Sequence, residues 1–151
     1  MEQRFLVTDE SGRLARWLRL LGHDTALMSA QPLSGLYRRA FDERRIIVTR
    51  NRRVRPSALF QVIQLESQAL TEQLRQMLRT LKLEIDPEQA FSRCDCCNVP
   101  VQPIDKMSVK DRVPPYVFET QQAFHICPAC QRIYWAATHW QRAQQFFAEL
   151  A

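Results

Sequence analysis

The chain has 151 residues, of which 46% are hydrophobic and 25% charged, and its formal net charge is +5. This size and composition fit one compact globular domain, or such a domain with a small module attached, and they exclude a disordered or low-complexity chain. No apolar run approaches the roughly 18 residues of a membrane span, and the N-terminus lacks the apolar core of a secretory signal, so we expect a cytoplasmic protein without a membrane partner.

The positive charge is concentrated in the N-terminal third. Residues 1–56 contain twelve arginines and six acidic residues, whereas residues 57–151 contain nine basic and ten acidic residues. The planar guanidinium group of arginine suits bidentate contacts with phosphate better than the ammonium group of lysine does. This distribution favours a nucleic-acid partner, although an ordinary solvated face rich in arginine would give the same pattern.

Short apolar runs alternate with amphipathic segments over the first half of the chain. The expected elements are a strand at 4–8, a helix that ends at Gly22, a strand at 24–28, a helix at about 33–43, strands at 46–49 and 59–65, and a helix at 71–82. Strands that alternate with helices predict an α/β domain with a mostly parallel sheet covered on both faces.

The first expected helix has two different faces. Leu14, Trp17, Leu18 and Leu21 recur at helical spacing, so we expect Trp17 to lie in the core rather than to stack on a base. The arginines of the same segment lie at other positions around the helix. One face should therefore pack on the sheet while the other carries positive charge.

The pattern changes after residue 83. We divide the chain into an α/β domain at 1–83, a polar connector at 84–92, and a second module at 93–151. Prolines and short apolar runs such as residues 116–118 suggest small β-hairpins in this module. Residues 138–150 have the pattern of a closing helix.

Two Cys-x-x-Cys pairs, separated by 29 residues, identify a metal site in the second module. Each pair forms a tight turn that presents two thiolates to one tetrahedral ion, and four thiolates close its coordination sphere. We therefore expect a structural zinc ion in a zinc ribbon, with iron as the alternative metal. The expected ligands are Cys94, Cys97, Cys127 and Cys130.

The cysteine cluster also allows other ligand sets and a disulfide alternative. Cys96 could replace Cys97, but its spacing from Cys94 is less suitable for a metal-binding turn. His125 could replace a cysteine, although a structural or surface histidine is the simpler interpretation. Disulfides are the alternative for the whole cluster, and they are rare in a reducing compartment.

Three sequence runs resemble the Mut-seven C-terminal ribonuclease domain family. They are SGRLARWLRLLGHD at 11–24, RRIIVTRNR at 44–52 and CPACQRIYWAATHW at 127–140. The resemblance extends over nearly the whole chain. It implies a PIN-like nuclease fold followed by a zinc ribbon, which agrees with the fold expected from periodicity, and it implies RNA as the partner.

PIN-like nucleases hold a divalent metal ion with acidic side chains at the carboxyl ends of their strands, and this chain lacks several of those acids. The family pattern places an Asp where this sequence has Thr8, an acid near Ser34, and an Asp where it has Asn51. Neutral oxygens are weak ligands for Mg²⁺. The resemblance therefore implies a nuclease fold with a degenerate metal site.

Three acids remain as candidates for catalysis with Mg²⁺ or Mn²⁺, namely Asp9, Glu10 and Glu66. A shift of one residue at a strand end can turn a side chain into the cleft. The alternative is that Asp9 and Glu10 only stabilise the positive end of the first helix, by about 0.3–1 kcal/mol.

The arginines remain as a candidate surface for a phosphate backbone. They are Arg13, Arg16, Arg19, Arg38, Arg39, Arg50, Arg52, Arg53 and Arg55. The leading hypothesis is an RNA-binding protein whose nuclease activity is weak or lost. The alternatives are an active metal-dependent endoribonuclease and a protein-interaction adaptor on a ribonucleoprotein such as the ribosome.

Overall fold

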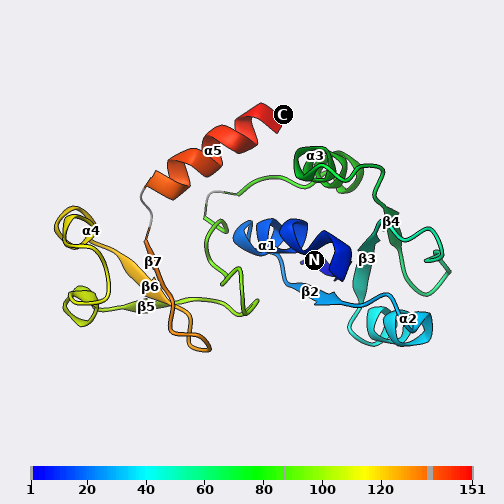
Figure 1. The fold of residues 1–151 in the computed structure, drawn as a ribbon, viewed down its shortest axis with the longest axis horizontal. Coiled ribbons are helices and arrows are strands. Elements are labelled where there is room, and N and C mark those ends of the chain that lie inside the picture. The colour runs from blue at the N-terminus through cyan, green and yellow to red at the C-terminus, as the bar shows by residue number, and fades with distance from the viewer. Residues whose placement is uncertain (1, 87, 136–137, 151) are drawn as a thin grey trace.

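The computed structural model describes residues 2–86, 88–135 and 138–150, with the side chains of 138–143 excepted (Figure 1). An α/β domain forms one end of the molecule and a small antiparallel ribbon forms the other. Among the described residues, no helix has both the length and the apolar character that a transmembrane segment needs.

A four-stranded parallel sheet, in the order β2-β1-β3-β4, forms the centre of the α/β domain. Its strands are β1 (Arg4–Thr8), β2 (Thr25–Met28), β3 (Arg45–Thr49) and β4 (Val62–Gln64). The chain runs from β1 to β2 on one side and returns to β3 on the other side of β1. Such a reversal opens a crevice at the carboxyl ends of the two strands, which is where ligands bind in open α/β sheets.

Both faces of the sheet are covered, as the near-continuous apolar strands predict. Helices α1 (Gly12–Leu20) and α3 (Leu70–Leu81) pack on the face that carries Phe5 and Val7. Helix α2 (Leu33–Asp42) packs on the opposite face, against Leu6 and Ile47. A short 3-10 turn, η1 (Asp9–Ser11), joins β1 directly to α1.

The C-terminal module contains a three-stranded antiparallel sheet in the order β5-β6-β7. Its elements are β5 (Gln102–Ile104), the 3-10 turn η2 (Lys106–Val109), α4 (Pro115–Thr120), β6 (Phe124–Ile126) and β7 (Ile133–Trp135). The buried residues Val109, Val117 and Phe124 form its own small core. The predicted fold class, a parallel sheet flanked by helices followed by a cysteine module, is confirmed.

Two details of the predicted elements were wrong. Residues 116–118 belong to helix α4 rather than to a hairpin, because Pro115 occupies the first helical position, where its fixed φ is compatible with a helix. The strand expected at 59–65 contains only Val62–Gln64, because a turn closed by a bridge between Ser57 and Phe60 precedes it.

The closing helix α5 (Thr138–Leu150) packs on the α/β domain rather than on the ribbon (Figure 1). Phe147 and Leu150 are buried in the core formed with α1 and α3. The Trp17 ring lies 5.0 Å from the ring of Phe146 and 5.6 Å from that of Phe147, between ring centroids. Trp17 is thus a packing residue, as predicted, and the helix completes the first domain after the chain has left the ribbon.

Replacement of Phe147 by Ala tests this packing. Phe147 is 5% exposed, and loss of a buried phenyl group leaves a cavity, so we expect the free energy of unfolding to fall by about 3 kcal/mol in urea titrations. The matched control is Gln145→Ala on the exposed side of the same helix, which should change it by less than about 0.5 kcal/mol. Equal effects of the two substitutions would contradict the packing.

Candidate functional site

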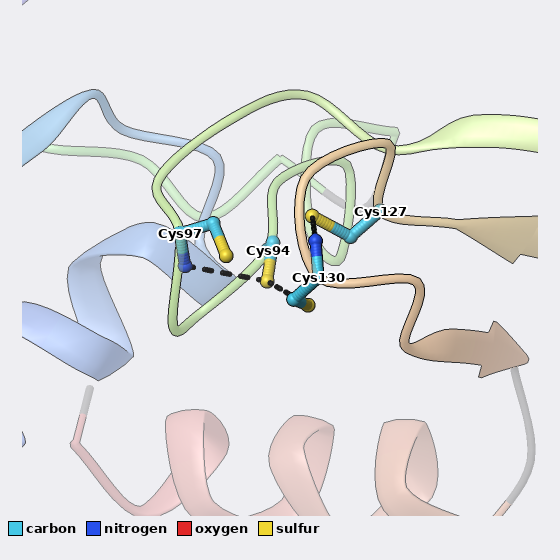
Figure 2. A group of neighbouring side chains, drawn as sticks. All are labelled: Cys94, Cys97, Cys127 and Cys130. Atoms are coloured by element: carbon cyan, nitrogen blue, oxygen red, sulfur yellow. Dashed lines mark hydrogen bonds between the residues drawn. The ribbon is translucent and has the colours of Figure 1, made fainter.

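Four of the five cysteines converge between the loops of the ribbon (Figure 2). Their Sγ atoms all lie within 4.8 Å of one another, although the two pairs are far apart in the sequence. Cys94 and Cys97 come from the loop before β5, and Cys127 and Cys130 come from the loop between β6 and β7. The four expected cysteines are therefore brought together, and Cys96 is not a member of the group.

Both cysteine pairs adopt the same turn. In each, the backbone N–H of the second cysteine donates to the Sγ of the first, at 3.4 Å in one pair and 3.5 Å in the other. The residue after each pair has a left-handed backbone, with φ of 61° at Asn98 and 66° at Gln131. The repeated geometry orients the two pairs of thiols toward one point.

The spacing of the thiols fits a tetrahedral metal ion. Cys94 Sγ and Cys130 Sγ are 3.8 Å apart, and two thiolates bound to one zinc ion at about 2.3 Å would be separated by about 3.8 Å. A disulfide would require about 2.05 Å, and all five cysteines are free thiols. The cluster could therefore hold a metal ion such as zinc. In the described part of the chain, it is the only group of three or more His, Cys, Asp or Glu side chains so placed.

The surroundings of the buried Cys94 thiol lower its pKa and so favour the thiolate form. Burial raises its pKa, but hydrogen bonds from the Tyr134 hydroxyl and from the backbone N–H groups of Cys97 and Cys96 lower it, with a net pKa of about 7. The Tyr134 hydroxyl lies 3.0 Å from Cys94 Sγ. Such a donor to a thiolate stabilises the form of cysteine that binds metal.

Asp95, inside the first cysteine turn, connects the cluster to α1. Its Oδ2 accepts hydrogen bonds from Arg16 Nη2 at 2.8 Å and from Arg16 Nε at 3.2 Å. Its Oδ1 lies 2.8 Å from the Tyr134 hydroxyl and 3.4 Å from Arg132 Nη1. Burial raises the pKa of Asp95, but the hydrogen bonds from Arg16 and Tyr134 hold it below its usual range. Sequence reasoning missed this residue because a lone acid between cysteines has no distinctive signature.

Arg19 is buried in the same interface and is only 9% exposed. Its Nε donates to the carbonyl of Thr25 at 2.9 Å, and its Nη1 donates to the carbonyl of Asp95 at 3.0 Å. Arg19 was expected on the nucleic-acid surface, but a guanidinium that is buried and bonded to carbonyl groups is not available to a phosphate. Arg16 is more exposed, yet it is bonded to Asp95.

A second polar cluster lies at the carboxyl ends of β1 and β3, the two neighbouring strands between which the strand order reverses. The buried hydroxyls of Thr8 and Thr49 are 2.7 Å apart, and Thr8 Oγ1 is 2.5 Å from Glu10 Oε1. The same carboxylate oxygen accepts the backbone N–H of Arg50 at 2.9 Å and lies 3.3 Å from Thr49 Oγ1. Glu10 is thus fixed across the two strand ends.

These contacts favour the ionised form of Glu10. Burial raises its pKa, but hydrogen bonds from Thr8, from the backbone N–H groups of Arg50 and Glu10, and from Thr49 lower it, and the net pKa is below its ordinary value of 4.5. Glu10 is therefore negatively charged at neutral pH.

The segment at 50–56, here called the arginine loop, follows β3 at the same edge of the sheet. Val54 is 2% exposed and anchors the loop in the core beneath α2. The hydroxyl of Tyr37 accepts the backbone N–H of Arg55 at 3.0 Å and lies 3.5 Å from the carbonyl of Arg53. The loop backbone is therefore held in place while the side chains of Arg52, Arg53 and Arg55 are exposed.

Apart from Arg19, which is buried and bonded to carbonyl groups, six of the nine candidate arginines form no ion pair with another residue that the structure describes. They are Arg13, Arg38, Arg50, Arg52, Arg53 and Arg55. Arg50 is half-buried and the other five are exposed. Arg39 differs because its Nε lies 2.7 Å from Glu43 Oε2. Four of these six arginines lie in the arginine loop.

Of the comparisons with known proteins, the one with protein families found a match. A family model for the Mut7-C RNAse domain matches residues 3–147. The chain belongs to the Mut7-C RNAse domain family. No curated protein and no solved structure matched it. The resemblance seen in three sequence runs is thereby confirmed over nearly the whole chain.

In this Mut7-C domain, the three candidate acids do not gather into one site. Asp9 and Glu66 are exposed, and the backbone N–H of Glu66 donates to Gln76 Oε1 at 3.0 Å. Within the described ranges, no three of the acidic side chains come close enough together to hold a metal ion. Only Glu10 reaches the two threonines at the strand ends.

The other two positions where the sequence lacks the family's acids serve local roles. Asn51 Oδ1 accepts the backbone N–H of Arg53 at 2.9 Å and so shapes the arginine loop. Ser34 is exposed in the first turn of α2. Neither residue adds negative charge to the crevice.

Replacement of Glu10 by Gln tests the polar cluster. Because the folded-state pKa is below 4.5, the carboxylate stabilises the fold at pH values above about 4.5, and this contribution disappears as the pH falls through the folded-state pKa. Because Glu10 is exposed and solvent screens its contacts, we expect Glu10→Gln to lower the free energy of unfolding by about 0.5 kcal/mol at pH 7, measured by urea titration. The difference from the unmodified protein should shrink toward pH 3. A difference that is constant over this range would contradict the assigned contacts.

Proposed function

We propose that this Mut7-C domain binds RNA through the arginine loop together with Arg13 and Arg38, and that its nuclease activity is weak or lost. The observation that carries the proposal is the charge at the carboxyl edge of the sheet. The arginine loop, whose arginines form no ion pair with another described residue, follows β3 at this edge, and of the candidate acids only Glu10 is bonded across the strand ends there.

Electrostatics support binding of a polyanion. A guanidinium without an intramolecular partner loses no ion pair when it contacts a phosphate, and each phosphate contact releases counterions from the nucleic acid. The fixed backbone of the arginine loop also reduces the entropy that is lost on binding. The family assignment points to RNA among polyanions.

The crevice does not fit a divalent cation that activates water. Mg²⁺ and Mn²⁺ favour several anionic oxygen ligands, whereas Thr8 and Thr49 supply neutral hydroxyls. Glu10 Oε1 is already engaged by donors from three residues. We therefore derive no hydrolytic step through these residues.

Two alternatives have observations in their favour. Glu10 is ionised at the strand ends, as an active endoribonuclease with Asp9 and Glu66 would require. At the opposite edge of the sheet, the exposed Phe41 and Leu59 line a cavity of about 540 Å³, as a protein-interaction adaptor would require. Both alternatives are distinguishable outcomes of the RNA experiment below.

We further propose that the cysteine cluster holds one structural zinc ion. Four thiol ligands leave no open position for water or substrate, so the ion would stabilise the ribbon rather than take part in catalysis. The free thiols accord with a reducing compartment such as the cytoplasm.

The metal proposal is tested by elemental analysis of the reduced protein. We expect about one zinc ion per chain, nearly complete loss of zinc in Cys94→Ser, and full zinc content in the matched control Cys96→Ser. Loss of the ion should also lower the thermal unfolding temperature, because its binding energy is folding energy. Absence of zinc from the unmodified protein, or its loss in both variants, would contradict the assigned ligand set.

The RNA proposal is tested by fluorescence anisotropy with a labelled 20-nucleotide single strand. If all six of the proposed arginines contact phosphates, the logarithm of the association constant should fall with the logarithm of salt concentration with a slope of about −4. A triple substitution of Arg52, Arg53 and Arg55 by Gln should reduce this slope to about −2, and Arg79→Gln on α3, an exposed control, should leave it unchanged.

The same reactions with Mg²⁺ or Mn²⁺ report cleavage. We expect none above background. Cleavage that disappears in Asp9→Ala or Glu10→Ala would favour the endoribonuclease, and binding without dependence on salt would favour the adaptor.

A further inference from the structure

A small cavity lies between the arginine loop and the edge strand β4. Its volume is about 290 Å³, and it is lined by Arg52, Val54, Arg55, Pro56, Val62 and Gln64. We propose that this cavity receives one nucleobase of single-stranded RNA while Arg52 and Arg55 contact the adjoining phosphates. The proposal rests on the RNA-binding function and assigns to it a base-binding subsite.

The floor of the cavity is apolar because of the alternation of side chains along β4. Ile63 points into the core shared with α1 and α3, so Val62 and Gln64 project to the opposite face. Val54 and Val62 pack with the core beneath α2 on this face. A flat, weakly polar ring can cover such a floor, whereas a free phosphate gains nothing from it.

The rim of the cavity is cationic and polar. Arg52 and Arg55 are exposed, and neither forms an ion pair with another described residue. A guanidinium can stack on a base and also donate to a phosphate. The side-chain amide of Gln64 offers both a donor and an acceptor to the edge of a base.

Backbone and ring contacts hold the loop that lines the cavity. The backbone N–H of Val54 donates to the carbonyl of Asn51 at 3.2 Å, which closes a turn at the start of the loop. Tyr37, whose hydroxyl binds the loop backbone, is itself stacked on Phe60, with ring centroids 4.9 Å apart and an interplanar angle of 18°. The subsite is thus preorganised by contacts outside the cavity.

Size and position favour a single base of an unpaired strand. Sites for small molecules usually measure about 300–1,000 Å³, so 290 Å³ accommodates one ring system rather than a base pair. Bases in an RNA duplex are stacked inside a deep, narrow major groove that side chains do not read. The cavity adjoins the other arginines of the loop, so a strand bound there would already lie on the phosphate-binding surface.

The test compares three labelled ligands of equal length: an oligouridine of 12 nucleotides, the same backbone with abasic residues, and a 12-base-pair RNA duplex. We expect the full-length protein to bind oligouridine about tenfold more tightly than the abasic strand, which is the usual effect of one base contact. The duplex should bind no better than the abasic strand.

Substitutions in the cavity test whether the preference for oligouridine arises there. Val62→Ala and Gln64→Ala should each reduce the preference for oligouridine over the abasic strand to about threefold or less, with the affinity for the abasic strand unchanged. Val101→Ala, the same substitution at a half-buried valine of the ribbon, should keep the tenfold preference. Circular dichroism and thermal unfolding show whether each variant remains folded.

The outcomes separate this proposal from the broader one. Salt-dependent binding of all three ligands with equal affinity would overturn the base subsite and leave RNA binding intact. Binding of none of them would overturn both. A preference for oligouridine that both cavity variants retain would place the base contact elsewhere and also overturn the subsite.

Discussion

The cysteine module and the α/β domain are joined through polar contacts, with Asp95 at their centre. Its buried carboxylate contacts Arg16 on α1 and Tyr134 on β7, and its backbone carbonyl binds Arg19. A carboxylate that is removed from water is stable only when its charge and lone pairs are matched, and Arg16, Arg132 and the Tyr134 hydroxyl do so here. Since Tyr134 also contacts Cys94 Sγ, the same contacts join α1 to the cysteine cluster.

This connection changes the meaning of the basic N-terminal region. Part of its arginine content serves internal docking, and Arg19 is the clearest case because it is buried. Asn98 also docks the cysteine module on the α/β domain. Its Nδ2 donates to Asp24 Oδ1 at 2.8 Å, and its Oδ1 accepts the backbone N–H of Thr25 at 2.9 Å. The arginines that remain unpaired are therefore a better guide to a ligand surface than the net charge of the chain.

The carboxyl edge of the sheet shows how a nuclease fold can be kept while its charge pattern changes. Thr8 and Thr49 form a buried hydroxyl pair, and Glu10 bridges them from the following turn. The hydrogen bonds that hold Glu10 all engage Oε1 and join the ends of β1 and β3. Fewer carboxylates at this edge mean less electrostatic repulsion of a phosphate that binds the arginine loop. This is the physical basis of the proposed shift from cleavage to binding.

Local patterns in the sequence were sufficient for the order of strands and helices, the parallel sheet, the cysteine pairs and the family, because apolar periodicity and Cys-x-x-Cys spacing act over a few residues. They were insufficient where distant residues decide the outcome. Helix α5, for example, returns to Trp17 although it follows the ribbon in the chain. The contacts of Asp95 and the Glu10 bridge join residues tens of positions apart, so only the tertiary structure could show which charges are matched internally and which remain free for a ligand.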